Sequence, residues 1–144
     1  MILLDTNVVS ESLRPRPSST VIAWLNAQPA ASLFLCTPVL AELHFGLARL
    51  AEGSRKDRLE AAIERMENEV FRGRILPFDA GAARQYGKLA AIRERAGRPI
   101  GQMDALVAAI ALSNQVALAT RDVADFLGCG LDVLNPFEVA APAQ

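Results

Sequence analysis

The sequence begins MILLDTN (residues 1–7), in which an unbroken apolar run, Ile2–Leu4, ends abruptly at Asp5. A short run without polar residues is typical of a strand in a parallel sheet, because helices bury such a sheet on both faces. Sheets of this kind bind ligands beyond the carboxyl ends of their strands. The opening residues therefore predict a buried first strand that brings the carboxylate of Asp5 to the functional edge of a parallel sheet.

Further apolar runs alternate with helical patterns along the rest of the chain. Short runs predict four more strands, at residues 32–36, 75–76, 116–119 and 131–134. Between them, apolar residues recur at steps of three and four, which predicts helices over 21–25, 37–51, 55–70, 82–96 and 101–114. Candidate residues for the helix starts are Ser18, Pro38 and Asp79. This alternation favours a three-layer α/β/α sandwich around a central, mostly parallel sheet of four to five short strands.

The composition is that of a packed globular protein. With 144 residues, of which 51% are hydrophobic and 22% charged, the chain is too apolar to be disordered. Lys and Arg number 15 against 16 Asp and Glu, and the net charge of −1 excludes a strongly basic protein that coats nucleic acids. It does not exclude an enzyme that acts on nucleic acid, because a local acidic site can be present in a chain of nearly neutral total charge. We expect a single domain over residues 1–144, with a loose tail at 140–144.

Few residues are available as soft metal ligands or for disulfides. Cys36 and Cys129 are too few for a disulfide scaffold, and with His44 as the sole histidine no Cys/His zinc site is expected. No apolar stretch reaches the roughly 20 residues that span a bilayer, and no charged leader precedes Asp5. We therefore expect a protein of the reducing cytoplasm that has no membrane association.

Four carboxylates stand out because each interrupts an apolar context. Asp5 ends the first strand, and Asp122 follows the expected fourth strand. Glu42 lies near the buried face of the helix after the second strand, and Asp104 lies in the first turn of an Ala-rich helix. Only a fold that returns each of these elements to one edge of the sheet can bring the four acids together.

Converging carboxylates repel one another, and in a partly buried site the pKa of at least one of them rises. A divalent cation removes this repulsion. Because the available ligands are oxygens, we expect Mg²⁺, with Mn²⁺ as a substitute, rather than Zn²⁺. Thr6, Asn7 and Thr120 are short polar residues beside the acids that suit a metal-bound water or a phosphate oxygen.

Three of the four acids also have an ordinary structural interpretation. Asp104 near a helix N-terminus suits the helix dipole, and Glu42 suits an ordinary helix composition. Asp122 suits a turn. Asp125 competes with Asp122 as the fourth acid, and it also suits a cap of the short segment that follows.

Four segments, in order, resemble the motifs of PIN-domain ribonucleases. They are MILLDTNVVSE (1–11), TPVLAEL (37–43), GQMDALVAAIA (101–111) and ATRDVADF (119–126), the last followed by NPF (135–137). The similarity covers residues 2–137, nearly the whole chain. It is closest to toxins of virulence-associated (VapC-type) toxin–antitoxin pairs, and among them to the trafficking-protein-B (FitB-like) branch.

The resemblance implies an α/β/α fold and a metal-dependent endoribonuclease toxin. It implies that Asp5, Glu42, Asp104 and Asp122 form an acidic cluster around Mg²⁺ or Mn²⁺. Many relatives have Asn at the position of Asp122 and an acid at that of Asp125, so either residue is the fourth acid. The resemblance also implies a homodimer and a cognate antitoxin, a small DNA-binding protein. Its C-terminal segment masks the site, and through it the complex binds operator DNA.

We therefore predict a hydrolase that cleaves RNA with metal-activated water and leaves a 3′-hydroxyl and a 5′-phosphate. Asp5, Asp104 and Asp122 are the predicted metal ligands, and Glu42 binds the metal directly or through a water and orients the nucleophile. One alternative is a non-catalytic regulatory subunit that binds operator DNA only together with its antitoxin. Another, a phosphoacceptor enzyme that uses Asp5, is disfavoured because position 7, where phosphatases carry a second Asp, is Asn.

A partner surface is expected near the acids, because an anionic pocket attracts an Arg or Lys from an antitoxin. Residues 43–50, with the aromatic ring of Phe45, form a candidate groove for a partner helix. Alternatively, Leu43 and Leu47 are buried in the core of the protein. The charged run at 55–58 is expected to be a solvated helix face.

Overall fold

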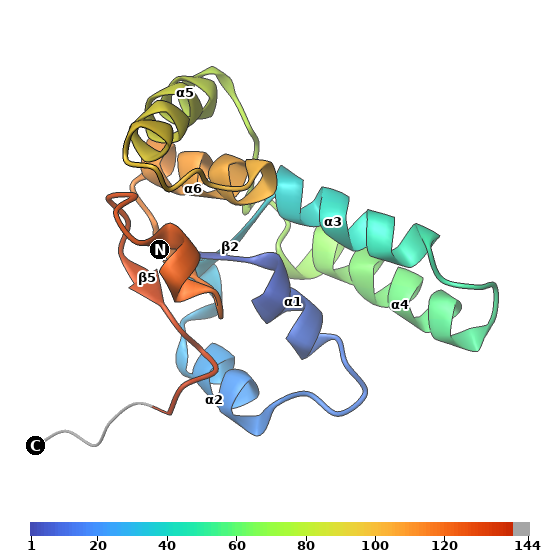
Figure 1. Cartoon of the computed structure of the whole chain (residues 1–144). Helices are drawn as coiled ribbons and strands as arrows, with labels where there is room; N and C mark the ends of the chain where they lie inside the picture. Colours follow the sequence, from blue (N-terminus) through green and yellow to red (C-terminus); the bar gives the residue numbers. More distant parts are fainter. Residues whose placement is uncertain (140–144) are drawn as a thin grey trace, which may run out of the picture.

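The structure is a computed structural model, and it describes residues 1–139. Five strands form one sheet in the order β3-β2-β1-β4-β5, and all four pairings in it are parallel (Figure 1). The strands are β1 (Ile2–Leu4), β2 (Leu33–Cys36), β3 (Ile75–Leu76), β4 (Ala117–Ala119) and β5 (Val133–Leu134). The prediction of four to five short, mostly parallel strands is confirmed. The tail predicted at 140–144 lies outside the described residues.

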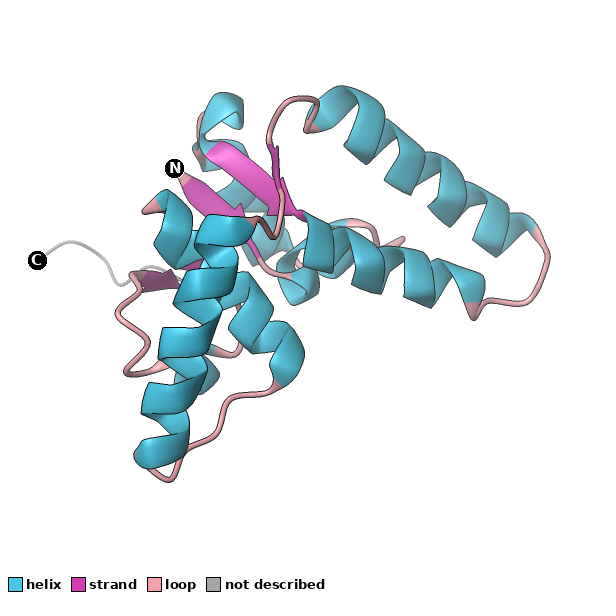
Figure 2. Ribbon diagram, turned by 90° about the horizontal axis from the view of Figure 1, so that it is seen from above, coloured by secondary structure: helices cyan, strands magenta, loops and turns pink. Residues whose placement is uncertain are grey.

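Helices cover the sheet on both sides. They are α1 (Thr6–Ser12), α2 (Ser19–Ala27), α3 (Thr37–Ala48), α4 (Ser54–Arg65), α5 (Ala80–Arg95) and α6 (Gln102–Asn114). Helices α5 and α6 pack together on one side of the sheet, whereas α1 and α2 lie on the other (Figure 1). Helices α3 and α4 form a hairpin that projects beyond the sheet (Figure 2). These layers confirm the predicted α/β/α sandwich.

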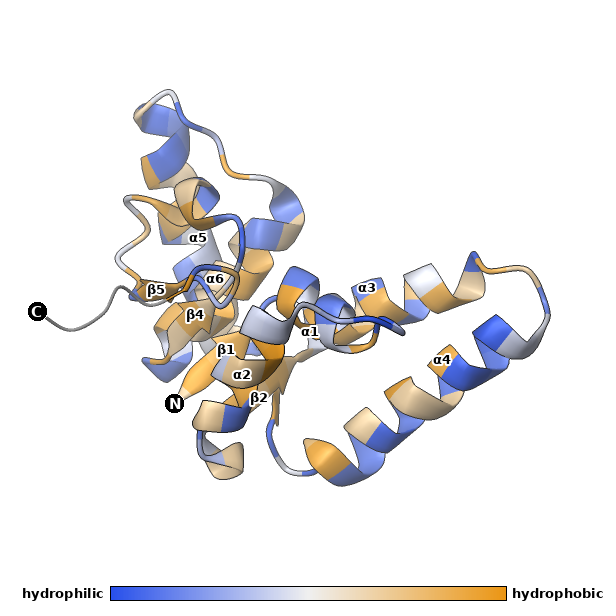
Figure 3. Ribbon diagram, turned by 90° about the horizontal axis from the view of Figure 1, so that it is seen from below, coloured by the Kyte–Doolittle hydropathy of each residue, from blue (hydrophilic) through white to orange (hydrophobic). Residues whose placement is uncertain are grey.

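The core lies on both faces of the three central strands, β2, β1 and β4. Leu3, Leu35 and Leu118, one from each strand, are completely buried. In Figure 3 these strands fall in the hydrophobic range of the colour scale. Full burial of one leucine side chain contributes about 1.5–3 kcal/mol relative to exposure. The unbroken apolar runs of the sequence are therefore explained by helices packing on both faces.

Three helices begin at the residues that the sequence indicates. The Ser18 hydroxyl accepts the N–H of Val21 at 3.4 Å and caps α2, and Pro38 lies in the first turn of α3. The Asp79 carboxylate accepts the N–H of Ala82 at 2.9 Å and caps α5. These caps satisfy backbone donors that have no partner within the helix.

Helix α1 is not predicted by the sequence pattern, which indicates only the end of a strand at Asp5. Thr, Asn and Val are weak helix formers, yet the helix forms because Val8 and Val9 are buried in the core. Asp5 is its N-cap, and Oδ1 accepts the N–H of Thr6 at 2.8 Å. Tertiary packing therefore overrides local propensity here, and the cap fixes the carboxylate of Asp5.

The remaining differences from expectation concern the bounds of elements and short 3-10 turns; the last strand, for example, is Val133–Leu134 rather than 131–134. Helix α3 ends at Ala48, before the expected end at 51. The helix expected over 55–70 is α4 followed by one turn of π-helix, Met66–Val70. A 3-10 turn, Val123–Phe126, lies between β4 and β5. Within residues 1–139, no helix has the length and apolarity of a transmembrane segment.

Removing the cap of α5 measures its contribution to stability. We expect Asp79→Ala to lower the free energy of unfolding by roughly 1 kcal/mol, because the N–H of Ala82 loses its acceptor. Asp79→Asn keeps an acceptor oxygen in the same place and is the matched control, with stability close to wild type. Urea unfolding of the three proteins checks this prediction, and equal losses in both variants would contradict it.

Candidate active site

Three neighbouring strands bring side chains to one edge of the sheet. Asp5 follows β1, Thr37 begins α3 directly after β2, and Thr120 follows β4. After β1 the chain builds β2 and β3 on one side and then crosses to β4 on the other side of β1. The connections that leave β1 and β4 therefore diverge, and ligands of open α/β sheets bind at such a switch point.

A series of hydrogen bonds joins the residues at this edge. The Thr120 hydroxyl donates to Asp5 Oδ2 at 2.8 Å. The same hydroxyl oxygen accepts the Asn7 amide at 3.2 Å, and that amide also donates to Asp122 Oδ2 at 3.1 Å. Asp5 and Asp122, from opposite ends of the chain, are therefore linked through two polar side chains.

Thr120 is the centre of this network. It is completely buried, and its hydroxyl oxygen also accepts the N–H of Asp122 at 3.1 Å. A hydroxyl has one proton to donate and two lone pairs that accept, so every position on this one is used. Thr120 therefore fixes both the carboxylate of Asp5 and the start of the segment that carries Asp122.

Glu42 joins the network from α3. Its Oε1 accepts the Thr6 hydroxyl at 2.8 Å, while the N–H of Thr6 donates to Asp5. Thr6 therefore holds two carboxylates at once. The three polar residues singled out in the sequence all lie beside the acids, and each donates to a carboxylate: Thr6, Asn7 and Thr120.

Asp104 approaches the same edge from the first turn of α6. Its pKa is raised to about 6, first by burial and then by four neighbouring carboxylates: Asp5, Asp125, Asp122 and Glu42. Asp104 interacts with the other acids through its charge, and its raised pKa shows that several carboxylates lie near it. The structure thus brings the four acids expected from the sequence to one edge of the sheet, together with Asp125.

Asp5 is the most buried of these acids, with 6% of its surface exposed. Burial raises the pKa of Asp5, and the hydrogen bonds from Thr120 and from the N–H of Thr6 oppose the rise because they stabilise the carboxylate. The charges of Glu42 and Asp122 act in the same direction as burial. The pKa of Asp5 remains raised overall, so a positive charge beside it is favourable.

The donor atoms at this edge are oxygens. Cys36 lies close enough to interact with the charges of Asp5 and Glu42, but burial raises the pKa of its thiol to about 12, so it stays protonated and is a poor metal ligand. His44 is exposed on α3, with Nε2 3.3 Å from Glu67 Oε2. Carboxylates without a thiolate or imidazole fit a hard divalent cation such as Mg²⁺ or Mn²⁺.

The acids share one edge, but Asp5, Glu42 and Asp122 each have their own hydrogen-bond partner. Within residues 1–139, no group of three or more His, Cys, Asp or Glu side chains is already arranged to hold a metal ion. Like charges repel, and Asp5, Glu42 and Asp122 accept from hydroxyl or amide donors. Each of these carboxylates keeps free lone pairs beside its hydrogen bonds, so a cation can be held at this edge if the acids turn or move toward one another.

The two candidates for the fourth acid differ in their contacts. Asp122 belongs to the hydrogen-bond network through Asn7, whereas Asp125 is connected to the site through its charge on Asp104. Asp122 also begins the 3-10 turn without capping it through its side chain. The contacts therefore favour Asp122.

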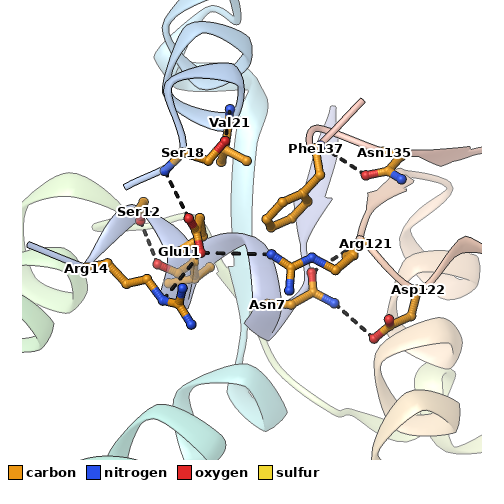
Figure 4. Close-up of polar contacts among 11 residues, drawn as sticks. Asn7, Glu11, Ser12, Arg14, Ser18, Val21, Arg121, Asp122, Asn135 and Phe137 are labelled. Carbon is orange, nitrogen blue, oxygen red and sulfur yellow. Dashed lines mark hydrogen bonds and ion pairs between the residues drawn. The ribbon is translucent and has the colours of Figure 1, made fainter. Parts of the chain in front are cut away.

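Sequence reasoning missed one buried acid, Glu11 on α1. Its Oε1 accepts the N–H of Ser18 at 2.9 Å, and its Oε2 lies 3.4 Å from Arg14 Nε and 3.9 Å from Arg121 Nη2 (Figure 4). The available signal is its spacing: Glu11 lies three residues after Val8, on the buried face of the helix. That spacing is informative only when residues 6–12 are known to be helical.

An apolar pocket of about 490 Å³ opens beside the acids. It lies between the loop after α1, helix α3 and helix α4, with Leu13, Leu50 and Leu59 in its lining. Glu42 belongs both to this pocket and to the hydrogen-bond network. The pocket therefore meets the acid network at Glu42.

The groove expected over residues 43–50 is present with a different lining. Leu43 lines the pocket, and Leu43 and Leu47 are both buried in the core. Phe45 is 63% exposed and lies outside the pocket. Arg55 and Arg58, from the run expected to be a solvated face, are exposed and border the pocket.

Comparison with known proteins identifies the family and close relatives. The family model described as "PIN domain" matches residues 2–126. The chain is 41% identical over 140 residues to "VapC ribonuclease Y4jK" of Sinorhizobium fredii, covering 97% of this chain and 100% of that protein. It is 39% identical over 137 residues to "Toxin FitB" of Neisseria gonorrhoeae, covering 95% and 99%.

Solved structures show the same fold. This chain superposes on a chain of the structure described as "Structure of FitAB bound to IR36 DNA fragment" with a TM-score of 0.92 at 36% identity. The superposition covers 99% of this chain and 100% of that one. "Crystal Structure of FitAcB from Neisseria gonorrhoeae" gives a TM-score of 0.86 at 37% identity, with 96% and 100% covered. The similarity therefore extends through the whole of each neighbouring chain.

The Thr120 hydroxyl can be tested without reference to any reaction. Thr120→Val is expected to lower the free energy of unfolding by about 1–3 kcal/mol, because buried polar groups lose their partner. It is also expected to raise the pKa of Asp5 further, which NMR titration of the carboxyl carbon measures. Thr120→Ser keeps the hydroxyl and is the control. A wild-type pKa of Asp5 in the valine variant would contradict the role of this bond.

Asp104 predicts a pH dependence of stability. Its folded-state pKa of about 6 lies above the ordinary value of 3.8, so the folded protein binds this proton more tightly than the unfolded chain does. Ionisation of Asp104 therefore destabilises the fold as the pH rises from about 4 to about 6. Asp104→Asn removes this effect, and its melting temperature in EDTA is expected to exceed that of wild type at pH 7.5 but not at pH 4.

The control for this experiment is Asp132→Asn, which alters an exposed aspartate outside the network. It is expected to follow the wild-type pH profile. A constant difference between Asp104→Asn and wild type across the whole range would contradict the assigned burial and charge of Asp104.

Proposed function

The chain belongs to the PIN-domain family, and we propose that it is a metal-dependent endoribonuclease, the toxin of a type II toxin–antitoxin pair. The observation that carries this proposal is the acid network at the switch point of the sheet, centred on the buried Asp5 and reaching Glu42 and Asp122. The relatives named as a VapC ribonuclease and as Toxin FitB support it. We also propose that residues 1–144 form one domain. The proposed location is the cytoplasm, where RNA is available.

The proposed metal ligands are Asp5, Asp104 and Asp122, with Glu42 binding directly or through a water and Asp125 as the alternate fourth acid. When bound, Mg²⁺, or Mn²⁺ in its place, supplies positive charge at the scissile phosphate and lowers the pKa of a bound water. The buried, crowded carboxylates supply the negative charge that retains such an ion.

The side chains of the protein orient the reactants. Glu42, held through Oε1 by Thr6, directs the attacking water, and the Asn7 amide beside Asp122 suits an oxygen of the phosphate as acceptor. The water oxygen forms a bond to phosphorus and gives up a proton, the bond from phosphorus to the 3′ oxygen breaks, and that oxygen takes up a proton. Hydrolysis of RNA therefore leaves a 3′-hydroxyl and a 5′-phosphate.

The pocket beside Glu42 supports a partner. We propose a cognate antitoxin, a small DNA-binding protein, whose C-terminal segment packs in this pocket and places a cationic side chain over the acids. Its DNA-binding part connects the complex to operator DNA, and the toxin forms a homodimer. Neighbouring structures described as FitAB and as VapBC2 from Rickettsia felis, each bound to a DNA fragment, support a complex of this kind.

The same DNA-bound structures favour a second candidate function. The chain then acts as a non-catalytic regulatory subunit that binds operator DNA only together with its antitoxin. The two functions differ in whether the purified chain cleaves RNA.

Cleavage of a single-stranded RNA by the purified chain distinguishes the two functions. We expect cleavage with Mg²⁺ or Mn²⁺ and none in EDTA. Asp5→Asn is expected to lower the cleavage rate at least about 100-fold. Mutation of residues that only hydrogen-bond to a metal ligand already costs about 10–100-fold in metal affinity or activity. Asp132→Asn, at an exposed aspartate outside the network, is the matched control and is expected to cleave at the wild-type rate.

Equal rates for wild type and Asp5→Asn would contradict the catalytic assignment. Absence of cleavage at every metal concentration, together with operator binding by the complex, would favour the regulatory subunit instead.

A further inference from the structure

Two arginines share one buried carboxylate next to the acid site. Glu11 is 8% exposed, and its Oε2 lies 3.4 Å from Arg14 Nε and 3.9 Å from Arg121 Nη2. Figure 4 shows Arg14 and Arg121 on opposite sides of Glu11. Two positive charges against one negative charge leave this Arg14–Glu11–Arg121 cluster with a net positive charge.

Arg121 is tied to the acid site through its backbone. It stands between Thr120 and Asp122, and its N–H donates to Asn7 Oδ1 at 3.1 Å. The Asn7 side chain therefore contacts both Asp122 and the backbone of Arg121 (Figure 4). The backbone of Arg121 is therefore adjacent to the acid network.

The Arg121 guanidinium is held in place and still accessible. Its central carbon lies 3.8 Å from the centre of the Phe137 ring, while 52% of the side chain is exposed. Stacking uses the face of the guanidinium, whereas its N–H donors lie in the plane and match the oxygens of a phosphate. Arg14, at 67% exposure, is also accessible. Because Arg121 is already ordered by Phe137, it loses little conformational entropy when it binds a ligand.

The charge of the site calls for such a cation. Among residues 1–139, Asp5, Glu42, Asp104 and Asp122 form no ion pair with an arginine or lysine. An RNA backbone that approaches these acids is repelled except where a cation faces its phosphates. Arg121 is a cation whose backbone adjoins the acid network, through the bond from its N–H to Asn7.

We infer that the Arg14–Glu11–Arg121 cluster binds the sugar–phosphate backbone of the RNA beside the acid site, with Arg121 on the phosphate next to the scissile one. This inference rests on the proposed ribonuclease function. Glu11 is a positioning residue, because it acts by holding the two arginines. The cluster sets where the strand lies and does not take part in bond breaking.

The test separates binding from chemistry. Arg121→Met is expected to raise KM for a single-stranded RNA about tenfold, the effect of losing one charge-assisted contact, with a smaller change in kcat. RNA affinity is also measured by fluorescence anisotropy in EDTA, which removes cleavage. There, the slope of log K against log salt is expected to fall by about 0.7 for each arginine replaced. Arg121→Lys keeps the charge and is expected to restore the slope but not the full affinity.

Arg65→Met is the matched control. Arg65 is 75% exposed on α4 and pairs through Nε with Glu69 at 3.6 Å, much as Arg14 pairs with Glu11. It is expected to leave KM and the salt slope unchanged. Circular dichroism checks that each variant folds. If Arg121→Met does not fold, Arg14→Met is the second variant, because the Arg14 side chain is more exposed than that of Arg121.

The outcomes distinguish this inference from the proposed function. Wild-type affinity and salt slope in both Arg121→Met and Arg14→Met would overturn the cluster as an RNA site, even where Asp5→Asn abolishes cleavage. Equal cleavage by wild type and Asp5→Asn would instead overturn the catalytic assignment. A loss of affinity in Arg65→Met equal to that in Arg121→Met would also overturn the inference, because it would show a general effect of surface charge.

Discussion

Repulsion between carboxylates gathered at one edge of a parallel sheet is the constraint on which the rest of this structure depends. The apolar strands exclude polar residues from the core and deliver Asp5 and Asp122 to the same edge. Burial and crowding raise the pKa values of Asp5 and Asp104. The buried hydroxyl of Thr120 relieves part of this strain by hydrogen bonding, and the remaining excess of negative charge is what makes the edge suitable for a hard cation.

Much of the fold follows from the sequence because its signals are local. Unbroken apolar runs identify the strands, and Ser18 and Asp79 mark helix starts through their own side chains. Helix α1 does not follow, because it depends on burial of Val8 and Val9 against the rest of the protein. A pattern of weak helix formers gives no local indication of that packing.

The sequence likewise predicts one part of the candidate site and not the other. The acids are found because each interrupts an apolar context, and the parallel topology brings them together. Their partners are not found, because a bond such as that from Thr120 to Asp5 joins distant parts of the chain. Glu11 is missed with α1. Arg14 belongs both to the apolar pocket and to the Arg14–Glu11–Arg121 cluster, so an antitoxin segment in the pocket and RNA on the cluster would compete for one surface.

The central claim is that these carboxylates form one oxygen-lined cation site. Anomalous X-ray diffraction from crystals soaked in Mn²⁺ tests it most directly. We expect a manganese ion at the switch point of the sheet, bound by Asp5 and Asp104 with Glu42 and Asp122 directly around it or one water away. Crystals that take up Mn²⁺ elsewhere, with none bound beside Asp5 and Asp104, would contradict it.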